Sequence, residues 1–209
     1  MTNLSIIGAG TMAAAIASVG VNGGARVQVL SRNIDAAVQI AANLGEQVAP
    51  GQLGDPLTGD IVVLAVPYTG LSQLVEQYTP ELGGKTLVDI CNPIDLATLD
   101  GLVVPQGSSA AEQVAVWAPD AHVLKAFNTT FAATLESGTV GGLPTTVLVA
   151  GDDPAAKRQL TDLLDAAGLV GLDAGGLSRA QQLEQLGFLQ ISLATAERIR
   201  WTGGFAVVR

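Results

Sequence analysis

The residues best suited to chemistry stand near the start of the chain, where an apolar run ends in Gly8-Ala9-Gly10-Thr11-Met12-Ala13. Between a strand and a helix, such a turn points backbone N–H groups and the positive helix end at a pyrophosphate, as dinucleotide sites do. Gly8 lets the chain turn sharply, Gly10 lets the backbone approach the phosphates, and Ala13 replaces a third glycine where helix packs on strand. The pattern predicts a dinucleotide site that includes Gly8 and Gly10.

Ser31 and Arg32 follow the next apolar run, residues 27–30, where a dinucleotide fold selects its cofactor. An acidic residue at this point would bond the ribose 2′-hydroxyl and repel a 2′-phosphate. A hydroxyl and a permanently charged guanidinium instead suit a phosphate dianion. We therefore expect NADP(H) to be favoured over NAD(H).

Apolar runs alternate with helical segments along the chain, which is typical of a sheet covered by helices on both faces. We predict an α/β, doubly wound, mainly parallel sheet of the Rossmann type with a C-terminal helical appendage. The chain would form one domain, residues 1–209, in which residues 1–174 are the NADP-binding core. Residues 175–209, a terminal helix and a tail, would complete the substrate side or a dimer contact. Breaker residues predict a loop over 49–59.

Further site residues are expected just after the strands, because ligands of open parallel sheets lie outside the carboxyl ends of the strands. Ala65, Val66 and Pro67 end one apolar run, and Asn128-Thr129-Thr130 follows another. Pro67 also suits a plain strand end, and the Asn-Thr-Thr segment equally suits a turn closed by its own side chains. Ser178, with Gln181 three residues on, suits a capping box for the last helix as well as a ligand contact.

Composition excludes several classes of function. The 209 residues include 19 acidic and 10 basic side chains, for a formal charge of −9, which argues against nucleic-acid and anionic-membrane partners. Cys91 is the only cysteine, so no intrachain disulfide forms and a cytoplasmic location is expected. We expect no signal peptide, and no apolar stretch is long enough to span a bilayer. With His122 the only histidine, no metal site is expected, and no catalytic residue can be named.

Several segments together resemble the NADPH-dependent coenzyme F420 reductases (F420:NADP oxidoreductases) over nearly the whole chain. They are the glycine turn, Ser31-Arg32, Ala65-Val66-Pro67, Asp89-Ile90-Cys91-Asn92-Pro93, Lys125-Ala126-Phe127-Asn128-Thr129-Thr130, Val149-Ala150-Gly151-Asp152-Asp153 and Asp173-Ala174-Gly175-Gly176-Leu177-Ser178. The resemblance implies direct hydride transfer between the nicotinamide C4 of NADP(H) and the C5 of the deazaflavin F420, a co-substrate. Such transfer depends on proximity and alignment more than on an acid or base.

The resemblance also implies roles for residues. Thr11, Met12, Ser31 and Arg32 would contact NADP, with Val66 and Pro67 under the cofactor. Asn128, Thr129, Thr130 and Ser178 would line the deazaflavin side. Because F420 carries a phosphate and an acidic glutamyl tail, we expect local cations at the cleft, drawn from Lys125, Arg179, Arg198 and Arg200.

Two other functions remain open at this point. The glycine turn also resembles that of pyrroline-5-carboxylate reductases, which would make the protein a reductase of a small imine or carbonyl. A non-catalytic protein that senses NADP would bind NADPH without turnover. The apolar terminal helix could complete the core or pair two subunits, and a homodimer is favoured.

Overall fold

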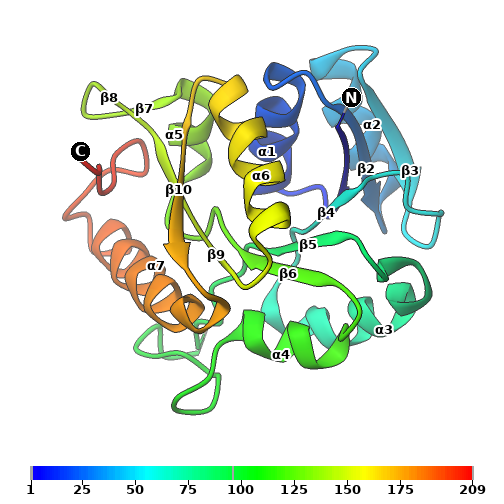
Figure 1. Ribbon diagram of the computed structural model, residues 1–209. Helices are drawn as coiled ribbons and strands as arrows, with labels where there is room; N and C mark the ends of the chain where they lie inside the picture. Colours follow the sequence, from blue (N-terminus) through cyan, green and yellow to red (C-terminus); the bar gives the residue numbers. More distant parts are fainter. Residues whose placement is uncertain (1, 96, 209) are drawn as a thin grey trace.

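Parallel strands dominate the computed structural model, which describes residues 2–95 and 97–208. In these residues a sheet of eight strands has the order β10-β9-β6-β5-β4-β1-β2-β3 (Figure 1). From β3 to β6 all neighbours pair in parallel, in the order 3-2-1-4-5-6 of a dinucleotide-binding fold. The predicted fold class is confirmed. The strands are β1 (Asn3–Ile7), β2 (Arg26–Ser31), β3 (Val48–Gln52), β4 (Ile61–Leu64), β5 (Thr86–Asp89), β6 (His122–Lys125), β9 (Thr146–Gly151) and β10 (Val170–Gly175).

Helices cover both faces of this sheet. They are α1 (Thr11–Asn22), α2 (Ile34–Leu44), α3 (Leu71–Leu82), α4 (Ala110–Trp117), α5 (Ala132–Ser137), α6 (Pro154–Ala166) and α7 (Ala180–Thr195). A small hairpin, β7 (Thr139–Val140) and β8 (Leu143–Pro144), follows α5. None of the helices in the described residues has the length and apolar character needed to cross a membrane.

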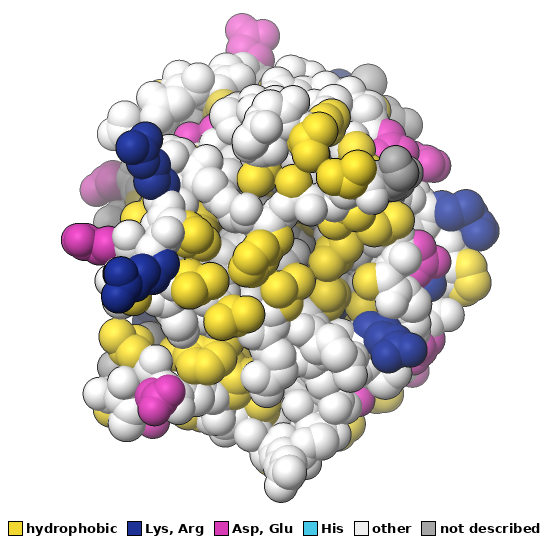
Figure 2. All heavy atoms as spheres, turned by 90° about the vertical axis from the view of Figure 1, so that its left-hand side faces the viewer, with side chains coloured by type: hydrophobic (Ala, Val, Ile, Leu, Met, Phe, Trp, Pro, Cys, Tyr) yellow, Lys and Arg dark blue, Asp and Glu magenta, His cyan; other side chains and the backbone are white. Residues whose placement is uncertain are grey.

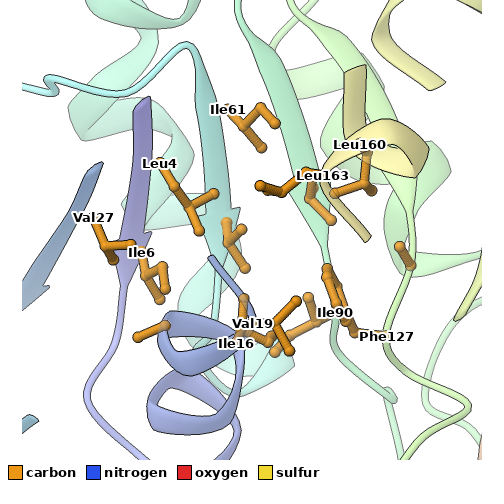
Figure 3. Packing of buried hydrophobic residues seen from close by; sticks show 14 of the residues in the cluster. Leu4, Ile6, Ile16, Val19, Val27, Ile61, Ile90, Phe127, Leu160 and Leu163 are labelled. Atoms are coloured by element: carbon orange, nitrogen blue, oxygen red, sulfur yellow. The ribbon is translucent and has the colours of Figure 1, made fainter. Parts of the chain in front are cut away.

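Two apolar cores lie on opposite faces of the sheet because successive side chains of a strand point to opposite sides. Ile6 of β1 belongs to the core formed with α1, α2, α5 and α6, whereas the next residue, Ile7, belongs to the core formed with α3 and α4. Figure 3 shows how Ile16 of α1 and Leu163 of α6 contribute to the first core. Both faces of the central strands are therefore buried.

Strands β9 and β10 run antiparallel to the other six strands of the sheet. β9 pairs with β6 in antiparallel register, Lys125 opposite Ala150, and β10 lies parallel to β9. The carboxyl ends of β9 and β10 consequently lie at the opposite edge of the sheet from those of β1 to β6. Helix α7 starts at that opposite edge, after β10, and leads back toward the carboxyl ends of β5 and β6.

The prediction of a loop over 49–59 was wrong at its start, because β3 forms a parallel edge strand against β2. Pro50 lacks a backbone N–H, and an edge strand tolerates this because its outer side has no strand to pair with. The strand was not predicted because Pro and Gly are frequent in this segment and are typical of loops.

Candidate functional site

A groove of about 690 Å³ lies at the carboxyl ends of β1, β2 and β4. Seven of the nine predicted cofactor residues line it: Gly8, Gly10, Ser31, Arg32, Ala65, Val66 and Pro67. Leu53, which follows β3, and Gln73 and Gln77 of α3 also line it. These three were missed because a loop residue and exposed glutamines carry no sequence pattern of their own.

The two glycines of the turn differ in what surrounds them. Gly8 has φ +128°, and a Cβ there would stand 2.2 Å from the carbonyl oxygen of Ala65. At Gly10 a Cβ would meet no atom within 4 Å, so the backbone here borders open groove. Helix α1 begins at the next residue with no side-chain cap and no acidic residue in its first turn. The free N–H groups and the open space at Gly10 fit a pyrophosphate.

Ser31 and Arg32 are held at the other end of the groove. The Ser31 hydroxyl accepts a hydrogen bond from the Asn33 N–H at 3.1 Å, and Gln52 Nε2 donates to the Arg32 carbonyl at 3.0 Å. The Arg32 side chain is exposed and forms no ion pair with any other residue that the structure describes. Its guanidinium is therefore available to a phosphate dianion, and the groove fits NADP(H).

An apolar cavity of about 370 Å³ adjoins the groove at the start of α1, where Gly10 lines the groove and Thr11 lines the cavity. Four predicted residues line this cavity, namely Thr11, Met12, Asn128 and Thr130, whereas Thr129 is buried and is not part of the lining. The other lining residues come from the ends of β5 and β6, from α5, and from α7 and the tail: Ile90, Asn92, Phe127, Phe131, Ala132, Ala133, Ile191 and Trp201.

A pair of asparagines supports one wall of this cavity. Asn128 Nδ2 donates to Asn92 Oδ1 at 2.9 Å and to the Leu183 carbonyl at 2.8 Å, and Asn92 Nδ2 donates to the Asn128 carbonyl at 2.9 Å. A Cβ at Gly187 would stand 2.3 Å from Asn92 Oδ1, so glycine allows α7 to approach the pair. The helix accordingly runs through Gly187 without a break.

Phe127, between β6 and this pair, is held in a tight turn. Its φ is +62°, and the Asn128 N–H donates to the Ala126 carbonyl at 2.8 Å. This is a γ-turn of the strained type, rare for a bulky residue. The Thr130 hydroxyl donates to the Phe127 carbonyl at 2.7 Å, so the segment closes on itself as the turn interpretation predicted.

Lys125 does not offer its charge to the cavity, and its predicted role at an anionic ligand was wrong. Its ammonium is fully buried and contacts Asp89 at 2.7 Å and Glu184 at 2.8 Å. Burial opposes the charged form, but Asp89, with help from Glu184, outweighs it and raises the lysine pKa above its ordinary value. Glu184 also accepts hydrogen bonds from the Ala110 N–H at the start of α4, and burial raises its pKa. The cluster joins α4 and α7 to the sheet.

Ser178 and Arg179 lie at the wrong edge of the sheet for the predicted roles. Both follow β10, whose direction is reversed, and the helix from Ala180 to Ile191 rises about 17 Å before it reaches the cavity. Ser178 therefore does not line the cavity. The capping box is not formed either, because no side chain caps α7 and Gln181 Nε2 donates to the Gly107 carbonyl at 3.0 Å.

The cavity offers nothing for acid–base or metal chemistry. None of its lining residues, among those described, has an ionisable side chain. Across residues 2–95 and 97–208, no group of three or more His, Cys, Asp or Glu could hold a metal ion. His122 lies at the opposite edge, 3.5 Å from Asp153. Cys91 is buried, and burial raises the pKa of its thiol.

Residues 3–93, which hold the glycine turn and Arg32, match the family described as "NADP oxidoreductase coenzyme F420-dependent". The F420-dependent NADP reductase of Methanocaldococcus jannaschii is 31% identical over 149 residues, which are 69% of this chain and 66% of that protein. Over these residues the chain is similar to this family.

Two further proteins are similar to this chain. Metalloreductase STEAP3 of Rattus norvegicus is 30% identical over 184 residues, 88% of this chain but only 36% of that protein. A crystal structure from Arthrobacter sp. FB24, provisionally named an F420-dependent NADP reductase, superposes with a TM-score of 0.86 at 25% identity and covers both chains in full. The chain spans less than two thirds of the length of both STEAP3 and the Methanocaldococcus jannaschii reductase.

Proposed function

We propose that the protein passes a hydride between NADP(H) and the deazaflavin coenzyme F420. One observation carries this proposal: an apolar cavity without an ionisable lining residue adjoins a groove suited to a dinucleotide. Reactions that need a positioned acid or base find no group there. Hydride transfer between two rings needs mainly alignment and the exclusion of water, which such a cavity supplies.

The roles of the residues follow from where they lie. The N–H groups at the start of α1 hold the pyrophosphate, and Arg32 binds the 2′-phosphate. Ala65 to Pro67 border the same groove. When bound, the nicotinamide and the deazaflavin supply the hydride donor and acceptor carbons. Since no lining side chain can give a proton, the proton that accompanies the hydride comes from solvent.

Two arginines are the remaining candidates for the anionic chain of F420. Arg198 and Arg200 are exposed, and they lie on the short segment between the end of α7 and Trp201 at the cavity wall. The chain carries a net charge of −9, so an anionic ligand depends on such local cations. We propose that these two side chains, and not Lys125 or Arg179, bind the phosphate and the glutamyl tail.

A homodimer and a cytoplasmic location are proposed alongside this activity. Figure 2 shows hydrophobic side chains gathered on the face that carries α7 and the C-terminal tail, with Lys and Arg toward its margins. Leu189 of α7 and Phe205 of the tail are about half exposed. Exposed apolar surface of this kind is typical of protein interfaces. Light scattering at several protein concentrations tests the dimer, and cell fractionation tests the location. The division at residues 174 and 175 stays a prediction.

Turnover with defined substrates tests the proposed activity. The protein is mixed with NADPH and oxidised F420, and loss of the deazaflavin absorbance is followed; pyrroline-5-carboxylate replaces F420 in a parallel reaction. We expect turnover with F420 only. Turnover with the imine alone would assign the protein to imine reduction, and tight NADPH binding without either reaction would make it an NADP sensor.

A further inference from the structure

Trp201 combines two properties that rarely occur together: it lines an apolar cavity and it is 52% exposed. It lies on the segment after α7, far in sequence from the glycine turn that borders the same cavity. A large aromatic face left open in a cavity wall is surface that a second ring covers favourably. The position therefore indicates a ligand contact and not only a packing role.

A second aromatic ring fixes the orientation of this indole. Phe131 and Trp201 lie with ring centroids 4.8 Å apart and their planes at 53°. Phe131 is only 8% exposed and immediately precedes α5, so it is the fixed member of the pair. Trp201 rests on this support and keeps about half of its surface free. Both rings belong to the lining of the cavity.

The rest of the cavity favours a flat and uncharged ring. Met12, Ile90 and Ile191 present apolar side chains. The lining also holds four polar side chains. Asn92 and Thr130 donate hydrogen bonds to their neighbours, whereas the buried Asn128 Oδ1 has no partner among the described residues and Thr11 is exposed. No lining residue is charged, so shape, stacking and a few polar contacts decide what binds.

We propose that Trp201 is a substrate-binding residue whose open indole face stacks on the planar ring of the second substrate. The identity of that ring, a deazaflavin, rests on the proposed function, whereas the stacking wall requires only a planar aromatic ring. NADPH, held through its phosphates at α1 and Arg32, does not depend on this wall for its affinity.

Tryptophan fluorescence tests the contact without any turnover. The chain has two tryptophans, and Trp117 on α4 lies outside the cavity lining. A Trp117→Phe variant therefore reports on Trp201 alone, and a Trp201→Phe variant is the matched control. Oxidised F420, added without NADPH, should quench the first variant saturably and the second far less. Equal quenching of both variants, or quenching of Trp201 by NADPH but not by F420, would overturn the proposal.

Affinity gives a second readout. Stacking of a heterocycle on an aromatic side chain predicts that Trp201→Ala raises the Kd for F420 about 5- to 150-fold. Trp201→Phe should restore most of the affinity, and the Kd for NADPH should stay within about twofold of wild type. An unchanged Kd for F420 in the alanine variant would contradict a stacking role.

The failure of this proposal is distinguishable from failure of the proposed function. If F420 neither binds nor turns over, the Trp117→Phe variant is titrated with 5-deazariboflavin and with FMN. Saturable quenching by either ring would retain the stacking wall while discarding F420 as the substrate. No quenching by any of the three rings would overturn the stacking wall itself.

Discussion

Replacing Gly10 by alanine should separate cofactor binding from folding. The backbone at Gly10 has φ −85° and ψ −177°, which any L-residue adopts, and an added Cβ would meet no protein atom within 4 Å. Alanine is a poorer N-cap than glycine but restricts the unfolded chain, and these two effects nearly cancel. The free energy of unfolding should therefore change by less than about 1 kcal/mol.

The same methyl group should strongly weaken NADPH, because it enters the space where the pyrophosphate approaches the backbone. A hydrogen bond to a charged group contributes about 1.5–3 kcal/mol. Losing one or two of them costs about 2–5 kcal/mol, which makes the Kd for NADPH about 30- to 5,000-fold higher. Isothermal titration calorimetry measures the Kd, and urea denaturation measures the stability.

Gly8 provides the matched control. Its φ of +128° and the Ala65 oxygen 2.2 Å from an added Cβ mean that Gly8→Ala should destabilise the fold by more than about 2 kcal/mol. Wild-type NADPH affinity in a folded Gly10→Ala variant would refute the placement of the pyrophosphate. Equal destabilisation by both substitutions would mean that the fold does not accommodate an added Cβ at Gly10.

Three further substitutions test separate parts of the account. Arg32→Asp should weaken the binding of NADPH at least about 100-fold more than that of NADH, since it replaces a partner of the 2′-phosphate with a like charge. An unchanged preference in binding assays would contradict the placement of the 2′-phosphate at Arg32. Lys125→Met should lower the free energy of unfolding by about 3–5 kcal/mol, because two buried carboxylates lose their cation. Lys157 pairs with the more exposed Asp173, and Lys157→Met should cost less than about 1 kcal/mol in the same urea titration. Ser178→Ala should leave kcat/KM for F420 within about twofold, and a tenfold fall would contradict its place at the far edge.

The fold and the dinucleotide groove could be predicted because their signals are local. The glycine turn, the apolar run before it and Arg32 occur at the spacing of one strand–helix–strand unit, and the residues after parallel strands meet at one edge. The strand-end part of the groove lining follows from that rule, whereas Gln73 and Gln77 of α3 do not. The same rule produced the error at Ser178, because nothing in the sequence of β10 reveals that it and β9 run antiparallel to β6.

The apolar cavity was only partly predictable, because its walls come from distant segments. Met12 and Asn128 follow strands, but Ile191 and Trp201 reach the cavity through the path of α7 and the tail. The burial of Lys125 could not be read from the sequence either. Its partner Glu184 lies on α7, and their contact depends on the packing of that helix against the sheet.

Hydride transfer itself is tested most directly by an isotope label. NADPH deuterated at C4, in separate samples for each of the two faces of the ring, is turned over with oxidised F420, and the reduced product is analysed by mass spectrometry and NMR. Direct hydride transfer predicts that one of the two samples delivers its deuterium to C5 of the deazaflavin, without exchange with water. Absence of turnover, or reduced F420 that carries only solvent hydrogen at C5, would contradict it.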